Sequence, residues 1–393
     1  MRKRDPSPAP ADSEPDPDWR TFTLVAVALA VTQLSYNLTA AALSLYLRDL
    51  GAAPGRIGFE VGLGNIAGLA LAFLVGPALN RYGSDRFLRL GGLLYLVAAV
   101  GMLLLRQEFL VALFRTLQGV GTAILLPSAY TLGARLIPRR RGAALGIMGS
   151  ISNLSLAIGP PIGLVLYGAH GAAWLLVPAI LASGVGLLAA SLVPRAKTTH
   201  QPARGFGFDR VWVPGLMANM LSSAYFGGSI AYLPLYLRHL HGPNAGIFFT
   251  ADAVGVLLLR VPTGMLVDRS GSLVPKLIGL VITLAGIGVL VFPPSIPVLI
   301  AAGACTGVGA GLLITGVMTD LSNLSREANR GTAMSTGGAS LSAAFFLGGT
   351  VSGLLIGPGG FNAVLAVGAV SCILAVPFVL AERATVARVK HAV

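Results

Sequence analysis

The strongest constraint on this chain is a series of apolar runs, each close to the length that crosses a lipid bilayer. Twelve runs can be drawn, each near the ~20 residues that a membrane helix needs. Connections between them are short, apart from residues 194–211. The sequence therefore predicts an all-α membrane protein with twelve transmembrane helices. Their expected bounds are 21–47, 57–80, 87–105, 109–134, 142–167, 173–193, 212–237, 245–267, 273–292, 296–321, 331–356 and 362–381.

Composition argues against a soluble protein. Of 393 residues, 54% are hydrophobic and only 11% are charged, whereas soluble domains carry about 25% charged residues. So few charges cannot cover a water-facing surface, which excludes a large soluble enzyme. The net charge of +13 does not indicate nucleic acid, because the basic residues lie in short clusters between apolar runs.

The basic residues predict the orientation in the membrane. Alternate loops and both tails hold 22 of the 28 lysines and arginines when Arg89 and Lys276, near the ends of their runs, are counted with the loops. The other loops hold 4, and Arg115 and Arg260 lie inside apolar runs. Because positive charge favours the cytoplasmic side, both termini and residues 194–211 are expected there, in a multi-pass protein of the cell membrane. The first eighteen residues read as a disordered tail. The run 21–47 is too long for a signal peptide.

The two halves of the chain repeat one another. The segment Gly76–Ser84 is echoed by Gly264–Ser272, and Gln118-Gly-Val-Gly is echoed by Thr306-Gly-Val-Gly, both 188 residues later. Secondary transporters are often built from such duplications, with the site between the halves. The expected organisation is a tail at 1–20, helical bundles at 21–193 and 212–381, a linker at 194–211 and a tail at 382–393.

Arg115 is a charge inside an apolar run, which costs roughly 3 kcal/mol or more at the centre of a membrane helix. Helical spacing puts it on one face with Gln118, Gly119 and Thr122. It either binds an anionic group or tunes a nearby carboxyl during proton exchange, or it is satisfied by backbone carbonyls and locks its helix. The repeat counterpart is the uncharged Gly303, which favours a specialised role.

Proton coupling needs a carboxyl whose proton affinity changes as it is desolvated and wetted. Asp252 is the best placed acid, and its alternative is an ion pair with Arg260. Glu60 follows, and its alternative is a pair with Arg56. A third acid, Asp320, lies at the end of its run.

Polar side chains also follow the faces of two predicted helices. They either line a substrate site by stacking and hydrogen bonding or join neighbouring helices. The candidates are Gln33, Tyr36 and Asn37 in the run 21–47, and Asn219, Tyr225, Ser229 and Tyr232 in the run 212–237.

These motifs resemble the major facilitator superfamily over about residues 21–381. Gly76–Arg86 resembles the family's signature loop between helices 2 and 3, with a copy at Gly264–Ser272. The resemblance implies conformational roles for Gly76, Asn80, Arg81 and Gly83, and for Gly264, Asp268, Arg269 and Gly271. Asn80 replaces the usual aspartate, so it can cap a helix but lacks the charge of a latch.

The stretch Phe114–Gly121 resembles the family's arginine motif in helix 4. The motif Ile158-Gly159-Pro160-Pro161-Ile162-Gly163 resembles one in helix 5 of exporters that run as proton antiporters. Asn244–Thr250 with Arg260-Val-Pro resembles bacterial drug or sugar efflux permeases. The resemblance implies two six-helix bundles and alternating access.

The sequence thus predicts a proton-coupled exporter of a small organic molecule such as a drug, sugar or metabolite. The alternatives are a facilitator or proton-symport importer, and a non-transporting sensor or scaffold. A monomer is expected, with substrate, protons and lipid as partners. No nucleotide loop or catalytic constellation is found, so neither ATP, another cofactor nor an enzyme is expected. His239 and His241 do not suggest a metal site, and Cys305 and Cys372 read as packing residues.

Overall fold

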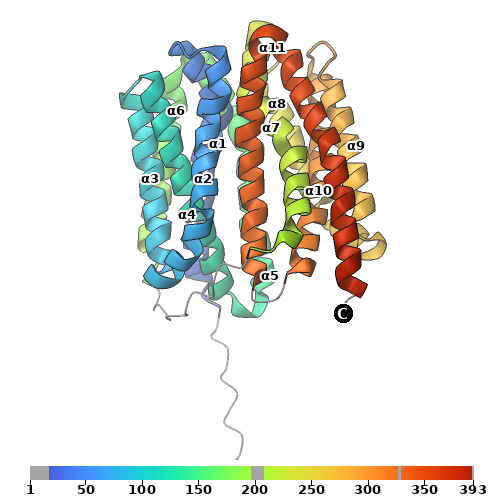
Figure 1. The fold of residues 1–393 in the computed structure, drawn as a ribbon. Coiled ribbons are helices and arrows are strands. Elements are labelled where there is room, and N and C mark those ends of the chain that lie inside the picture. The colour runs from blue at the N-terminus through green and yellow to red at the C-terminus, as the bar shows by residue number, and fades with distance from the viewer. Residues whose placement is uncertain (1–16, 196–207, 326–328, 392–393) are drawn as a thin grey trace, which may run out of the picture.

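The computed structural model describes residues 17–195, 208–325 and 329–391, and every regular element in those ranges is helical (Figure 1). The tail before residue 17 and most of the expected linker lie outside the described residues. The helices are α1 Trp19–Asp49, α2 Pro54–Tyr82, α3 Ser84–Leu104, α4 Glu108–Leu136, α5 Arg141–His170, α6 Ala172–Leu192, α7 Val213–His239, α8 Gly246–Ser270, α9 Leu273–Val289, α10 Ile296–Leu324 and α11 Arg330–His391, with 3₁₀ turns η1 Pro138–Arg140 and η2 Arg210–Trp212.

The last element contains two of the predicted spans. At Gly360 the backbone takes φ 56° and ψ −152°, a conformation open to glycine because it lacks a Cβ. Apolar stretches run over Thr332–Gly357 and Gly359–Val386 on the two sides of this kink. The described residues therefore contain the twelve helical segments that the sequence predicts. Eight of these segments are long and apolar enough to cross a membrane, while the apolar stretches of α8 and α9 are shorter.

The helices pack as two groups joined along two seams. In the first group α3 packs on α4 and α6, α1 packs on α5 and α6, and α2 packs on α4. In the second, α7 packs on α11, and α10 packs on α8 and α9. The seams are formed by α2 with α11 and by α5 with α8, and α1 also contacts α7. All of these helices run roughly along one direction (Figure 1).

The two seams are equivalent under the sequence repeat. In one, Gly58 lies so close to Gly349 that a Cβ on Gly58 would overlap the carbonyl group of Gly349. In the other, Gly246 lies equally close to Pro161. The offsets are 246 − 58 = 188 and 349 − 161 = 188. The repeat read from the motifs is therefore also a repeat of contacts.

The halves meet at one end of the molecule and separate toward the other. At the end away from the C-terminus, Arg238 of α7 donates to both carboxylate oxygens of Asp49 at 2.7 and 3.0 Å, and Tyr167 of α5 donates to Asp49 at 2.6 Å. Toward the terminal end the approach of α2 to α11 loosens: a Cβ on Gly58 would overlap Gly349, one on Gly62 would lie 3.0 Å from Phe346, and one on Gly68 would lie 3.8 Å from Ser342. We call these the closed end and the open end.

Several boundaries differ from the prediction. The final helix continues to His391, ten residues beyond the expected end at 381, because its charged segment ends the apolar pattern but not the helix. Lys276 was counted with the loop residues, yet it is buried within α9 and pairs with Asp320 at 2.5 Å and Glu382 at 2.6 Å. The acids lie 44 and 106 residues away, so local sequence does not reveal them.

Candidate functional site

Arg115 of α4 is 1% exposed and meets only neutral groups. Its Nη1 donates to Oε1 of Gln118 at 3.0 Å, and its guanidinium carbon lies 4.0 Å from the ring centroid of Tyr36 on α1. Its Nε is buried without a hydrogen-bond partner. Within the described part of the chain, no carboxylate pairs with it and no backbone carbonyl accepts from it. The geometry does not match the alternative in which backbone carbonyls satisfy this charge.

The close approach of α2 and α4 creates this position. Gly119 of α4 packs against the backbone of Gly64 on α2, where a Cβ would overlap the Gly64 carbonyl. A Cβ on Gly64 would in turn lie 3.1 Å from the carbonyl oxygen of Arg115 and 3.4 Å from its Nε. Small residues let helix backbones approach in this way. The arginine side chain occupies the space beside Gly64.

A second tyrosine extends the polar cluster into α3. The hydroxyl of Tyr95 donates to Oε1 of Gln33 at 3.2 Å and shares a hydrogen bond with Oγ1 of Thr122 at 2.6 Å. Its ring lies edge-on to Tyr36, with centroids 6.2 Å apart. Sequence reasoning missed Tyr95, and the available signal was a single tyrosine in an otherwise apolar helix. The cluster comprises Gln33, Tyr36, Tyr95, Arg115, Gln118 and Thr122.

Asp252 of α8 is, like Arg115, a buried charged residue that is hydrogen-bonded by neutral side chains. It is 3% exposed, and its Oδ1 accepts hydrogen bonds from Oγ1 of Thr306 at 2.7 Å and from the hydroxyl of Tyr225 at 3.1 Å. Both donors are neutral, and no cationic side chain that the structure describes pairs with Asp252. The side chain of Arg260 lies outside the described residues. In the sequence Thr306 stands out only as the repeat counterpart of Gln118. Its hydrogen bond to Asp252 makes it a residue of the candidate site.

The other candidates on α7 separate into different contacts. Asn219 donates to Oγ of Ser340 at 2.8 Å and joins α7 to α11. The hydroxyl of Tyr232 accepts from the backbone N–H of Gly58 at 2.8 Å and donates to the carbonyl of Pro54 at 3.0 Å, which places it in the α2 seam. Ser229 is buried in the same helix. The polar side chains of α7 therefore have two roles: some join α7 to neighbouring helices, and Tyr225 hydrogen-bonds Asp252.

Glu60 belongs to a separate charged cluster near the closed end. Arg56 lies 3.1 Å from Oε1 of Glu60 and 3.2 Å from Oε1 of Glu108. This ion pair with Arg56 is the alternative to proton coupling that the sequence offers for Glu60. Its role in proton coupling stays a prediction.

The motif residues occupy helix ends and helix contacts. Gly83 ends α2 with φ 93°, and Gly271 ends α8 with φ 75°, at the repeat offset. Arg81 and Arg269 are exposed in the last turns of these helices. The side chains of Asn80 and Asp268, and the surroundings of Gly76, lie outside the described residues.

The helix 5 motif forms the contact between α5 and α1. A Cβ on Gly159 would clash with Asn37, and one on Gly163 would overlap the carbonyl of Leu38. Pro160 is buried between them. The motif therefore acts in packing in this conformation.

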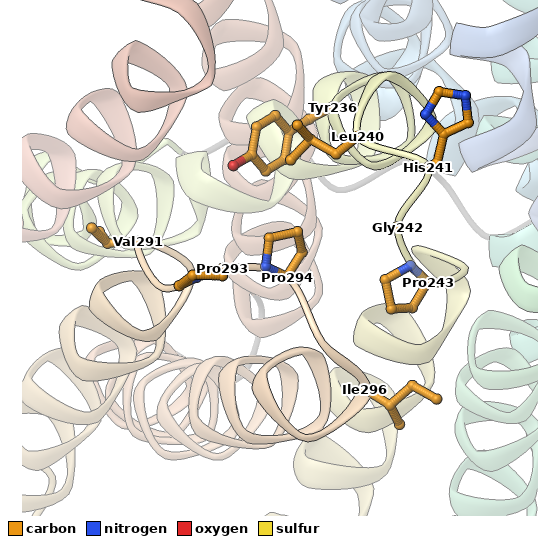
Figure 2. A pocket seen from close by; sticks show the side chains of 9 residues that line it. All are labelled: Tyr236, Leu240, His241, Gly242, Pro243, Val291, Pro293, Pro294 and Ile296. Carbon is orange, nitrogen blue, oxygen red and sulfur yellow. The ribbon is translucent and has the colours of Figure 1, made fainter.

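The closed end carries two pockets that sequence reasoning did not anticipate. One, of about 880 Å³, lies between the end of α7 and the loop before α10 (Figure 2). The other, of about 530 Å³, is lined by Arg48, Arg238 and His239, and shares Tyr236 and His241 with the first. No group of three or more metal-ligating side chains occurs among the described residues. The lining of the first pocket is Tyr236, Leu240, His241, Gly242, Pro243, Val291, Pro293, Pro294 and Ile296.

Comparison with known sequences and structures places this arrangement among transporters. A sequence model described as the Major Facilitator Superfamily matches residues 25–245 and 215–392. An uncharacterised MFS-type transporter of Salmonella typhimurium is 28% identical over 326 residues, covering 79% of this chain and 81% of that protein. A multidrug resistance protein B homolog of Mycobacterium tuberculosis is 24% identical, covering 62% of this chain and 59% of its own length.

Solved structures share the fold at low identity. The nucleoside transporter NupG, in a mutant form, superposes with a TM-score of 0.79 at 12% identity, covering 93% of this chain and 99% of that one. A bacterial homolog of the human lysosomal transporter Spinster, solved in an inward-facing and occupied conformation, superposes with a TM-score of 0.70 at 15% identity, covering 96% and 98%.

Proposed function

Because the chain belongs to the major facilitator superfamily, it is a membrane transporter and not an enzyme, and we propose that it is a proton-coupled exporter of a small organic molecule. The proposed site lies at mid-membrane between the two halves, where repeat-built transporters bind their substrates. Arg115 and its cluster contribute from the first half, and Asp252 contributes from the second.

One observation carries the proposal for proton coupling: Asp252 is a buried acid held by two neutral hydroxyl groups. Burying a carboxylate without a cation is costly, and a proton removes that cost. The proton occupancy of such a group therefore depends on whether water reaches it. Alternating exposure of Asp252 to the two sides would load and release one proton per cycle.

The contacts between the halves support an alternating-access cycle. The ion pair between Asp49 and Arg238 holds the closed end, while the approach of α2 to α11 loosens from Gly58 to Gly68 toward the open end. Rocking of one half against the other would exchange these arrangements. With the termini in the cytoplasm, as the loop charges predict, this conformation would open to the cytoplasm and accept substrate for export.

Export is the direction favoured by the names of two relatives. The Mycobacterium tuberculosis homolog and a Bacillus subtilis protein, 26% identical over 137 residues, are both named for multidrug resistance. The helix 5 motif at Gly159–Gly163 points the same way by resemblance. We therefore propose efflux over import.

The test is transport by purified protein in proteoliposomes with an imposed pH gradient, over a panel of drugs, sugars and metabolites. An active compound should accumulate with the gradient and lose that accumulation when the gradient is collapsed. The variant Asp252→Asn should abolish gradient-driven accumulation while retaining counterflow of the same compound at a concentration high enough to offset any weaker binding. Full gradient-driven transport by this variant would exclude Asp252 as the coupling group, and transport that ignores the gradient would exclude proton coupling.

A further inference from the structure

Arg115 and Asp252, which pair with no oppositely charged side chain among the described residues, lie at the same helix crossing in the two halves. In the first half α4 crosses α2 where Gly119 packs against Gly64. In the second half α10 crosses α8 where Gly307 packs against the backbone of Asp252. The offsets are 252 − 64 = 188 and 307 − 119 = 188. The crossings are therefore counterparts under the repeat.

The charges at these crossings have opposite signs and come from opposite helices. Arg115 extends from the fourth helix over Gly64, and its counterpart in the second half is Gly303. Asp252 extends from the eighth helix, and its counterpart in the first half is Gly64. Each half thus carries a charge at a position of the crossing where the other half has glycine.

The neutral groups that hold the two charges are also counterparts. Gln118 accepts from Arg115, and Thr306, at the same place in the repeat, donates to Asp252. Equivalent positions on α4 and α10 therefore each hydrogen-bond a charged side chain, which is a cation in the first half and an anion in the second.

Both charges lie at one depth, beside the contact between the halves. The tight seam contacts at Gly58 and Gly246 precede Gly64 and Asp252 by six residues, which is about 9 Å of helix. Nearer still, Gly62 contacts Phe346 across the α2 seam, and Thr250 donates to the carbonyl of Ala157 across the α5 seam at 2.7 Å. Asp252 itself, and the Gly64 against which Arg115 packs, thus each lie two residues from a contact with the opposite half, on the side of the open end.

Within the described part of the chain, neither charged side chain has an oppositely charged partner. Arg115 bonds Gln118 through Nη1 and leaves Nε buried without a partner. Asp252 bonds two neutral hydroxyls through one oxygen. Buried charges are normally paired, because an uncompensated charge in a low-dielectric interior is strongly unfavourable. A ligand that brings the opposite charges would complete both sites together.

We propose that the transported substrate is a zwitterion, whose anionic group binds Arg115 and whose cationic group binds Asp252. Guanidinium groups bind carboxylates and phosphates by charge-assisted hydrogen bonds, and the unpartnered Nε supplies a donor for such a group. A bound zwitterion would connect the two halves at one depth in the membrane. The first half would bind its anionic group, and the second half would bind its cationic group. The inference rests on the proposed function, because it assigns the substrate class of that transporter.

The test is binding to the purified full chain in lipid nanodiscs, measured by calorimetry at one pH. Two zwitterions of different charge spacing serve as probes, phenylalanine and 4-amino-3-phenylbutyric acid. Each is compared with its N-acetyl derivative, which keeps only the anion, and with its methyl ester, which keeps only the cation. At least one zwitterion should bind about tenfold or more tightly than both of its derivatives.

The variants separate the two ends of the ligand. Arg115→Gln should remove the advantage of the zwitterion over the ester, and Asp252→Asn should remove its advantage over the N-acetyl derivative. Arg106→Gln, at an exposed arginine, is the control and should change neither ratio. Thermal unfolding of each variant checks that it is folded, and Arg115→Lys should recover part of the lost preference if charge is what matters.

Several outcomes overturn the inference without touching the proposed function. Binding of neither zwitterion does so, as does equal binding of a zwitterion and a singly charged derivative. Gradient-driven transport of a neutral or singly charged panel compound would then leave the exporter standing. Conversely, charge-dependent zwitterion binding together with transport that ignores the pH gradient would support the substrate class and contradict proton coupling.

Discussion

Charged side chains inside the helices fall into two kinds according to their partners. Lys276 is buried between Asp320 and Glu382, and Arg56 bridges Glu60 and Glu108. These groups meet opposite charges within their own half of the chain. Among the described residues, the partners of Arg115 and Asp252 are neutral, and both side chains lie beside the contact between the halves. We infer a structural role for Lys276 with its two acids, and we propose a functional role for Arg115 and Asp252.

The lysine between two acids gives a stability prediction. The variant Lys276→Met leaves Asp320 and Glu382 buried without their cation, and breaking a buried ion pair in this way costs about 3–5 kcal/mol. Glu382→Gln should be much milder, because it leaves Lys276 paired with Asp320 at 2.5 Å. The midpoint of thermal unfolding in detergent should fall far more for the first variant. Similar midpoints for the two would contradict a structural role for this lysine.

At the scale of whole helices, glycine contacts decide where two helices can cross. A Cβ on Gly119 would overlap the carbonyl of Gly64, whereas a Cβ on Gly142 would meet nothing within 4 Å. Both residues lie inside helices, so the difference between them is the neighbouring helix and not local propensity. The tight crossing is the one that positions Arg115.

Alanine at these two glycines should therefore have opposite consequences. Gly119→Ala must push α2 away from α4, and overpacking of this kind costs about 1–3 kcal/mol. Transport should also fall, because Arg115 moves with the crossing. Gly142→Ala should be neutral or slightly stabilising, since alanine favours a helix by up to about 1 kcal/mol over glycine. Unfolding midpoints and transport rates of the pair measure this, and an unaffected Gly119→Ala variant would argue against the tight crossing.

The sequence predicted the elements well because apolar length is a local property. All twelve helical segments are predicted by the sequence, and the motif pair at Gln118 and Thr306 marks the two equivalent crossings, each of which holds one of the two charges. Partners distant in the chain were not foreseen. The bonds of Tyr95 to Gln33 and of Lys276 to Glu382 span 62 and 106 residues. The even polar spacing along α7 also concealed that Tyr232 belongs to a seam.

For the molecule as a whole, the conformation is set by contacts at one end. Asp49 of α1 accepts from Arg238 of α7 and Tyr167 of α5, so one carboxylate ties three helices from both halves. The seam contacts at Gly58 and Gly246 lie at the same end. An alternating cycle requires these contacts to be weak enough to break. The ion pair meets this requirement, because its side chains are 51% and 39% exposed and exposed pairs contribute little.

Removing this carboxylate should shift the population away from the present conformation. An exposed ion pair contributes about 0.2–1 kcal/mol, so Asp49→Asn should lower the ratio of this conformer to its alternative by up to about fivefold. A cysteine introduced at Gly264, near the open end, reports the change when Cys305 and Cys372 are replaced by serine. Its rate of labelling by a water-soluble thiol reagent should fall in Asp49→Asn, because the open end is exposed for a smaller share of the time. Arg106→Gln is the control, since the exposed Arg106 donates to the nearby carbonyl of Leu103 and should leave the rate unchanged. An equal or faster labelling rate in Asp49→Asn would show that Asp49 does not hold the closed end.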